Sequence, residues 1–420
     1  MTALLIAVFL VTLAIGVPVA FSIVLAAMAV LAAGDVNMGM MIQRMFTSTD
    51  SFPLIAVPFF ILAGDLLAQG AISKYLVAFA ESFLGVIKGG LSIVAVVAGM
   101  FFAAISGSGA ATTAAVGATL IPELRKRGYR TDSASALIAA SGTIGVVIPP
   151  SVPMVLYAVA SGASLIRLFK NGFGPGLMMG GVLIAIALYQ AYRYNYPKGA
   201  AFSLKNVGKT FIKAIPGILM PCIILGGIFS GKFIPSEAAA VAVVYAMLVS
   251  IFIYRDLTLK KLVDIIAGSA KTSAIIMIII ACSGPFGWVL AKYRIPENIA
   301  QAILGVSDNM YVIMLLIAIV IIIAGVFMET SSAIIILTPV FLPLVKTLGI
   351  DLVHFGILFT VGIAIGMITP PVAINLFVAS GITGLPIEKI AKAVIPYLIG
   401  LLIIFLLVVY LPMFIPGIIL

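Results

Sequence analysis

Hydrophobic residues run through this chain in long stretches that contain no charged residue. Such stretches occupy residues 1–34, 171–192, 214–231, 272–291 and 393–420. Each is close to or longer than the ~20 residues that a helix needs to cross the hydrocarbon core of a bilayer. The pattern therefore predicts a polytopic membrane protein built from helices.

Two further apolar stretches, the first charge-free and the second with a single charge in its interior, have lengths that do not suit simple crossings. The first covers residues 89–122, and its middle, residues 106–113, contains only Ser, Gly, Ala and Thr. Irregular backbone at membrane depth survives only where protein or a cavity surrounds it, so this pattern predicts a re-entrant hairpin over 89–124. The same design recurs over 309–346, where the turn falls near Glu329.

Each predicted hairpin is followed by a charge-free stretch with two consecutive prolines near its middle. Proline removes a backbone donor and clashes with the preceding turn, so we expect a discontinuous helix at each place. A simple proline kink is the alternative, but the recurrence after both hairpins favours a paired break. The two predicted helices are 133–168, interrupted at Pro149-Pro150, and 353–385, interrupted at Pro370-Pro371.

The two sets of elements are related by a fixed offset of 221 residues. This offset matches Pro122 with Pro343, Gly128 with Gly349, Gly145 with Gly366, and the first proline pair with the second. Most Lys and Arg residues fall in connections that our predicted path places in the cytoplasm, as the positive-inside rule requires. An odd number of crossings then separates the hairpins, so the first opens to the cytoplasm and the second to the outside. The predicted fold is all-α, with two inverted-topology repeats, which is a design of secondary transporters.

The same path predicts how the chain is divided. Residues 3–32 are expected to cross the membrane as one helix. The basic segment 194–213 is expected on the cytoplasmic side, either on the anionic membrane surface or as a solvated linker. The predicted parts are an N-terminal scaffold helix with an outer loop at 1–52, a first repeat at 53–170, scaffold helices including the linker at 171–255, a second repeat at 256–387, and a C-terminal helix at 388–420.

Composition narrows the class of protein further. The chain is 63% hydrophobic and 9% charged, whereas an ordinary soluble domain carries about 25% charge. The formal net charge of +10 is explained by cytoplasmic loops of a membrane protein, and we expect no nucleic-acid partner. Cys222 and Cys282 lie in apolar stretches without metal or redox spacing, so we expect them to be packing residues.

The breaks and the hairpin turns are the candidate binding chemistry. A broken helix frees carbonyl oxygens, which suit Na⁺, and amide groups at a positive dipole end, which suit a carboxylate. The predicted Na⁺ ligands are Ser106, Gly107, Gly145, Ile148 and Pro150 in the first repeat, and Gly325, Met328, Gly366, Thr369 and Val372 in the second. The predicted substrate-binding residues are Ser108, Gly109, Thr112, Pro150, Ser151, Glu329, Thr330, Ser331, Pro371 and Asn375. Small residues also pack membrane helices tightly, so packing is the alternative for any single member.

Acidic residues are scarce inside the predicted spans. Glu329 is the one charge in the second hairpin's apolar stretch, and intramembrane carboxylates are functional by default. Asp65 falls near a predicted span end and is expected to be interfacial. This scarcity favours coupling to Na⁺ over H⁺. A membrane-embedded enzyme is disfavoured, because no catalytic cluster or nucleophile–base pair lies in the predicted spans.

Several stretches at these places resemble the large membrane subunit of tripartite ATP-independent periplasmic (TRAP) transporters. The resemblance covers essentially the whole chain. Its most specific stretches are FFAAISGS at 101–108, AASGTIGVVIPPS at 139–151, PSEAAA at 235–240, VHFGI at 353–357 and IGMITPPVAINLFV at 365–378.

The resemblance implies an elevator-type secondary transporter of the bacterial inner membrane. It implies Na⁺-coupled import of a small organic acid, a carboxylate that a periplasmic binding protein delivers. A small membrane subunit is expected as a separate chain, and Na⁺ is expected as the coupling ion, with no organic cofactor. The alternative is a stand-alone carboxylate transporter or exchanger that needs no binding protein.

Overall fold

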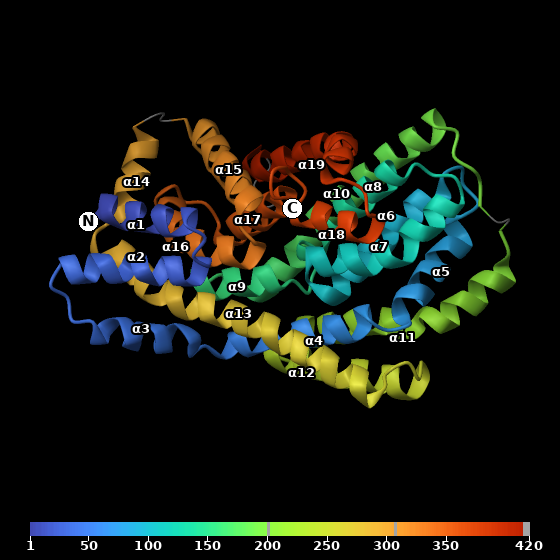
Figure 1. Ribbon diagram of the computed structural model, residues 1–420, viewed down its shortest axis with the longest axis horizontal. Coiled ribbons are helices and arrows are strands. Elements are labelled where there is room, and N and C mark those ends of the chain that lie inside the picture. Colours follow the sequence, from blue (N-terminus) through green and yellow to red (C-terminus); the bar gives the residue numbers. More distant parts are fainter. Residues whose placement is uncertain (200–201, 306–308, 415–420) are drawn as a thin grey trace.

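The computed structural model describes residues 1–199, 202–305 and 309–414, and the elements named in it are all helices. These helices form two layers, which Figure 1 shows one above the other. The outer layer contains α1 (Thr2–Ala14), α2 (Val19–Ala33), α3 (Gly39–Thr49), η1 (Phe52–Ile55), α4 (Ala56–Ala68), α5 (Ile72–Leu84), α11 (Leu204–Phe229), α12 (Pro235–Leu248), η3 (Val249–Ile253) and α13 (Leu259–Lys292). Helix α14 (Ile295–Leu304) connects this layer to the second one by packing on α13 and α16.

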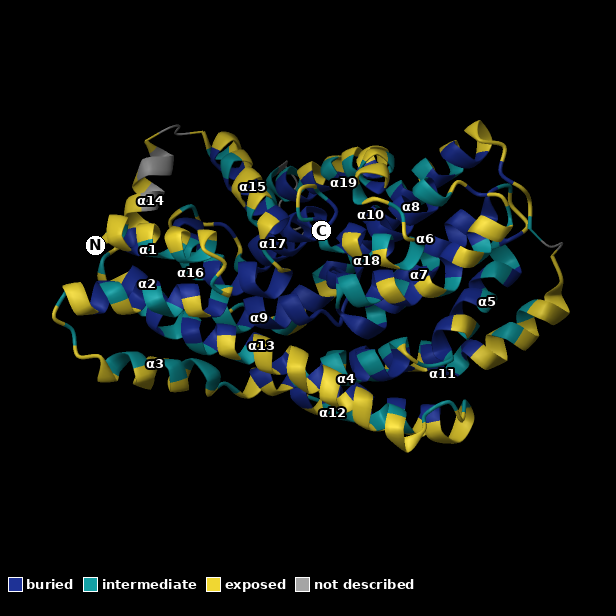
Figure 2. Ribbon diagram, viewed as in Figure 1, coloured by how far each residue is buried: buried dark blue, intermediate teal, exposed yellow. Residues whose placement is uncertain are grey.

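The second layer, called here the inner bundle, contains the predicted hairpins and broken helices. Its members are α6 (Gly90–Ser106), α7 (Gly109–Lys126), α8 (Thr131–Thr143), η2 (Ile144–Val146), α9 (Val152–Ser161), α10 (Leu165–Arg193), α15 (Met310–Phe327), α16 (Thr330–Thr347), α17 (Leu352–Gly366), α18 (Ile374–Thr383) and α19 (Ile387–Phe414). Buried residues concentrate in this bundle (Figure 2), where α8, α9 and α17 are almost entirely buried. Among the described residues, seven helices are long and apolar enough to cross a membrane, or eight if the bent pair of α3 and η1–α4 counts as one.

The order of elements confirms the predicted repeat. Helix α6, its turn, α7 and the broken helix α8–α9 are followed by the long α10, and α15 to α19 repeat this order. The two hairpins enter the bundle from opposite ends (Figure 1), as the inverted arrangement requires. Each hairpin packs its second arm on the other repeat, because α7 lies against α18 and α16 lies against α9.

Both hairpins lie close to their predicted bounds of 89–124 and 309–346. The first turns at Gly107 and Ser108 between α6 and α7, and the second turns at Met328 and Glu329 between α15 and α16. The second broken helix also matches, because α17 and α18 fall inside the predicted range 353–385 to within one residue.

The first broken helix ends earlier than predicted. Its second half, α9, stops at Ser161, where Gly162 adopts a left-handed conformation with φ of 75°. A new helix, α10, begins at Leu165 with Ser164 as its N-cap. The predicted range 133–168 therefore extends past the end of α9. Within this charge-free stretch, Gly162 is a C-cap signal that ends one helix and Ser164 is an N-cap signal that begins the next.

The N-terminal prediction of one crossing over residues 3–32 is wrong. Helix α1 ends at Ala14, Gly16 has φ of 85°, and α2 begins at Val19 after Pro18 and packs back on α1. The region 1–52 also contains α3 in place of the predicted outer loop. Gly16 and Pro18 end the first helix here. Hydropathy alone predicts one continuous helix, because the residues on both sides are apolar.

Two other predicted parts have different boundaries in the structure. Helix α10, assigned with residues 171–255 to the scaffold, packs on α6, α17 and α19 of the inner bundle. The last part of the linker 194–213 is the start of α11, so Lys205, Lys209 and Lys213 lie on a helix. Three short parts of the predicted regions lie outside the described residues: 200–201 of the linker, 306–308 of the second repeat and 415–420 of the C-terminal part.

A buried polar network joins the two repeats inside the bundle. The Gln190 side-chain oxygen on α10 accepts hydrogen bonds from Ser133 Oγ of α8 at 2.6 Å and from the Tyr397 hydroxyl of α19 at 2.9 Å. Tyr397 is only 1% exposed. Because water cannot replace a partner here, the network fixes how α8, α10 and α19 pack.

We expect Tyr397→Phe to lower the thermal stability of the purified protein, because it removes one buried hydrogen bond that is worth about 1 kcal/mol. Melting in detergent measures this change. Tyr410→Phe is the matched control, because the Tyr410 hydroxyl donates to Tyr311 O at an exposed position on the same helix. Equal melting shifts for the two variants would contradict a stabilising role for the buried network.

Candidate functional site

The first hairpin turn fits closely against the first break. We call residues 106–109 the first tip and residues 144–151 the first break. Gly107 ends α6 in a left-handed conformation with φ of 60°, and a Cβ atom there would lie 2.8 Å from the Pro150 carbonyl oxygen. A Cβ atom on Gly145 would lie 2.6 Å from the Ser108 carbonyl oxygen. Only glycine allows both approaches, so the sequence sets the distance between tip and break.

Oxygen atoms gather where the first tip meets the first break. Ser106 Oγ lies 2.9 Å from Thr112 Oγ1 and 3.2 Å from the Ser108 carbonyl oxygen. Both Ser106 and Thr112 are buried. Hydroxyl and carbonyl oxygens in one buried cluster are the ligand type that hard cations prefer.

The second hairpin turn makes the corresponding contact in a different way. We call residues 328–331 the second tip and residues 367–373 the second break. A Cβ atom on Gly366 would overlap the backbone of Gly325, so α15 and α17 touch through two glycines. The Glu329 carboxylate caps α16 by accepting from Ser331 N at 2.9 Å, Ser332 N at 3.2 Å and Ser331 Oγ at 3.1 Å. The negative charge therefore sits at the positive end of a helix.

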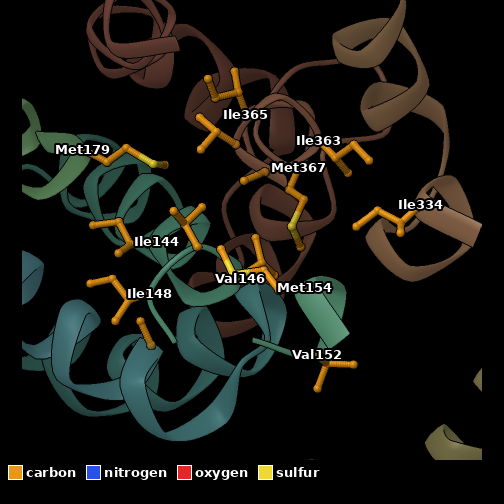
Figure 3. Close-up of a cluster of buried hydrophobic side chains, with 14 of the residues drawn as sticks. Ile144, Val146, Ile148, Val152, Met154, Met179, Ile334, Ile363, Ile365 and Met367 are labelled. Carbon is orange, nitrogen blue, oxygen red and sulfur yellow. The ribbon is translucent and has the colours of Figure 1, made fainter. Parts of the chain in front are cut away.

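The second break differs from the first in its exposure. Pro149 and Pro150 are buried, whereas Pro370 and Pro371 are exposed. Helix α10 covers the first break, where a Cβ atom on Gly172 would lie 2.8 Å from the Val147 carbonyl oxygen. Both proline pairs have a cis peptide bond. The apolar side chains around the two breaks nevertheless share one core, in which Val146 and Met154 lie near Met367 (Figure 3).

A cavity of about 290 Å³ lies between the two tips and the outer layer. Its inner wall carries the first tip, the second tip and Met367, and its outer wall carries Asp65 of α4 and Thr272 of α13. Outer and inner layers touch closely beside it, because a Cβ atom on Gly64 would lie 2.9 Å from Ser106 Cα. The cavity is therefore an interlayer space whose walls belong to different parts of the fold.

The charges on the cavity wall are all negative. Asp65 and Glu329 line it, and none of the described residues that line it is Lys, Arg or His. The polar groups on the wall are otherwise hydroxyls and backbone groups of the two tips and of Thr272. Asp65 is half-buried and accepts a hydrogen bond of 2.6 Å from Ser269 Oγ of α13. An anion entering this space therefore meets no positive side chain from the part of the chain that the structure describes.

Seven of the predicted site residues line the cavity. They are Ser106, Gly107, Ser108, Gly109, Glu329, Thr330 and Ser331. Thr330 Oγ1 lies 3.3 Å from Met367 Sδ, which brings the second tip against the end of α17. The structure thus places the two tips, which are far apart in sequence, in one space.

The other predicted residues lie behind the tips or at the breaks. Ser151 uses its hydroxyl to donate to the Val146 carbonyl oxygen at 2.5 Å, and Ile148 packs its side chain on Gly176 of α10. Thr369 Oγ1 donates to the Ile365 carbonyl oxygen at 2.9 Å. The remaining members that do not line this cavity are Thr112, Gly145, Pro150, Gly325, Met328, Gly366, Pro371, Val372 and Asn375.

Asn375 stands out among the residues behind the tips because it joins the two repeats. Its Nδ2 donates to the Ala139 carbonyl oxygen of α8 at 3.1 Å, and its backbone N donates to the Met367 carbonyl oxygen at 3.0 Å. Its Oδ1 is buried and has no hydrogen-bond partner among the described residues. A buried acceptor without a partner is costly, so this atom is a candidate ligand for a cation or a substrate donor.

Sequence reasoning missed the outer wall of the cavity. Asp65 lies in the last turn of α4, near a helix end as expected, but it also lines the cavity, as does Thr272 of α13. The sequence did contain a signal, because Asp65 is a carboxylate within an apolar segment. Such carboxylates are functional by default, as argued above for Glu329. The cavity is also lined by apolar side chains, among them Val146, Val152 and Met367, that no sequence pattern distinguishes from core residues.

Comparison of folds places the chain beside a known transporter. The crystal structure of the YdaH transporter from Alcanivorax borkumensis, described as having an unusual topology, superposes with a TM-score of 0.67. The match covers 89% of this chain and 88% of that one at 14% identity, so it speaks for the fold alone.

Sequence comparisons identify the family. An isethionate TRAP transporter permease protein, DctMQ, of Oleidesulfovibrio alaskensis is 41% identical over 97% of this chain, which spans 65% of that protein. The C4-dicarboxylate large permease protein DctM of Pseudomonas aeruginosa is 41% identical over 88% of this chain and 86% of its own length. The sialic acid large permease protein SiaM of Vibrio cholerae is 35% identical over 95% of this chain and 94% of its own length.

The family model reaches across nearly the whole chain. Residues 6–414 match the model described as the DctM component of the tripartite ATP-independent periplasmic transporter. Together with the apolar helices, this match makes the protein a multi-pass protein of the bacterial inner membrane. The chain belongs to the DctM family, the large permease subunits of TRAP transporters.

Proposed function

We propose that this chain imports a small organic acid together with Na⁺, and that a periplasmic binding protein delivers the substrate. The observation that carries this proposal is the charge of the cavity. Among the described residues, two carboxylates and no Lys, Arg or His line it, so a bare organic anion would be repelled. Cations that enter with the substrate would reverse this balance, and the oxygen cluster of Ser106, Ser108 and Thr112 would bind one of them.

The substrate is proposed from the same chemistry and from the relatives. Their names give isethionate, C4-dicarboxylates and sialic acid, which are small organic anions. Because Glu329 already accepts from the amides at the start of α16, the hydroxyls of Ser108 and Thr330 on the cavity wall would bind an acidic group of this kind. Because isethionate is a sulfonate, we extend the expected class from carboxylates to small organic acids in general.

The proposed movement is that of an elevator. The inner bundle would slide against the outer layer and carry the cavity's inner wall with it. The walls of the cavity support this proposal, because the inner wall belongs to the inner bundle and the outer wall to α4 and α13 of the outer layer. A small membrane subunit is the proposed partner of the outer layer in the bilayer.

Uptake by proteoliposomes tests the function. The chain is reconstituted with its small subunit, and the cognate binding protein is first assigned a ligand by thermal shift across carboxylates and sulfonates. We expect accumulation only with the loaded binding protein and an inward Na⁺ gradient, with at least about a tenfold loss when K⁺ replaces Na⁺, the equivalent of ~1.4 kcal/mol. Equal uptake in K⁺ would contradict the coupling ion. Full uptake without the binding protein would support the stand-alone alternative.

A further inference from the structure

A second hollow lies away from the tips, between α11 and the inner bundle. It has a volume of about 410 Å³ and is lined almost entirely by apolar atoms. Its walls come from α11, α5, α6 and α10, and include Gly217, Pro221, Cys222 and Phe229 of α11. Helix α11 packs mainly on α5, and the groove is the space that remains between α11 and α6. We call it the α11 groove.

The dimensions of the α11 groove suit one lipid chain. It follows α11 from Gly217 to Phe229, and the twelve steps between these residues rise roughly 18 Å at 1.5 Å each, close to the ~15 Å hydrocarbon depth of one leaflet.

A positive charge marks one end of the α11 groove. The Lys170 ammonium lies 5.7 Å from the ring centroid of Phe229, and Lys170 is exposed. Phe173, one turn further along α10, lines the groove itself. A cation at the mouth of an apolar groove matches a lipid whose headgroup is anionic and whose tail is apolar.

We propose that the α11 groove binds one acyl chain of an anionic phospholipid, with its phosphate against Lys170. The groove wall includes Ala104 and Ile105, the two residues before Ser106 of the first tip. A bound chain would therefore fill the space between α11 and the hairpin that carries the tip. If the elevator of the proposed function operates, this lipid would restrain the inner bundle against the outer layer. The binding itself does not depend on transport.

The chain carries its own reporter for this site. It has two cysteines; Cys222 is exposed in the groove and Cys282 is buried. We expect phosphatidylglycerol to slow the reaction of N-ethylmaleimide with Cys222 in the detergent-purified full chain. Phosphatidylcholine should do so at about fivefold higher concentration, the contribution of one lysine near an anionic headgroup. Lys170→Ala should remove the difference between the two lipids.

Native mass spectrometry gives an independent reading on folded protein. Phosphatidylglycerol should stay bound to the wild type and to Cys222→Ala, and should be lost from Cys222→Trp, whose ring fills the groove. Equal protection by both lipids in the wild type, or an adduct unchanged in Cys222→Trp, would overturn the proposal. Protection by the small subunit but not by lipid would also overturn it, in favour of a protein partner. None of these readings requires uptake, so they stand apart from the test of function.

Discussion

Gly107→Ala is expected to reduce Na⁺-driven uptake by at least about tenfold, the effect of ~1.4 kcal/mol on an equilibrium. Two causes combine at this residue. Its left-handed conformation costs an L-residue roughly 1–2 kcal/mol, and the new Cβ atom would lie 2.8 Å from the Pro150 carbonyl oxygen and 3.1 Å from Val152 N. The tip must move away from the break, which displaces the oxygen cluster of Ser106, Ser108 and Thr112.

Gly162→Ala separates these two causes. Gly162 has φ of 75° and ends α9, but a Cβ atom there would meet nothing within 4 Å. It should therefore show the backbone strain as lower melting in detergent while keeping the Na⁺ dependence of uptake. The measurements are the initial uptake rate at several Na⁺ concentrations and the melting temperature of both variants. If both variants transport equally, close contact between the first tip and the first break is not needed for function.

Glu329→Gln is expected to raise the Na⁺ concentration for half-maximal uptake by about tenfold, close to ~1.4 kcal/mol of lost attraction. The amide can still accept a hydrogen bond at the start of α16, where the carboxylate now accepts from Ser331 N and Ser332 N. What it loses is one of the two negative charges on the cavity wall. Uptake at saturating Na⁺ should therefore recover much of the wild-type rate.

Glu329→Ala removes the cap as well as the charge. Losing an N-cap side chain typically costs about 1 kcal/mol, so only this variant should also melt at a lower temperature. Glu388→Gln is the matched control, because Glu388 is an exposed acid in the first turn of α19 and does not line the cavity. An unchanged Na⁺ curve for Glu329→Gln would exclude this carboxylate from ion coupling and leave it a structural cap.

The sequence contained enough information for the inner bundle. Two consecutive prolines interrupt a helix locally, so the breaks at Pro149-Pro150 and Pro370-Pro371 and the turns at Gly107 and Glu329 could be placed within a few residues. Single prolines did not have this effect, because Pro175 and Pro285 lie inside continuous helices. Their equal spacing in both halves gave the repeat, and the fold confirms it. Local signals of this kind transfer directly from a sequence to a structure.

The outer layer and the exposure of the breaks could not be predicted in the same way. Asp65 reaches the cavity only because α4 packs beside the first tip at Gly64, a contact between distant segments. The burial of Pro150 and the exposure of Pro371 likewise depend on whether the following long helix covers the break. Hydropathy did not predict the turn at Gly16 and Pro18 either, because apolar residues flank this turn on both sides.

The exchange of hairpin arms between the repeats bears on the ancestry of this architecture. Helix α7 rests on α18, with Gly117 against Ile382, while α16 rests on α9. A solitary ancestral copy would have left its arm uncovered and half of the binding space open. It could have completed the site only by forming a dimer with a second copy inserted in the opposite orientation in the same bilayer. Fusion of two such copies into one chain would have made this antiparallel dimer permanent.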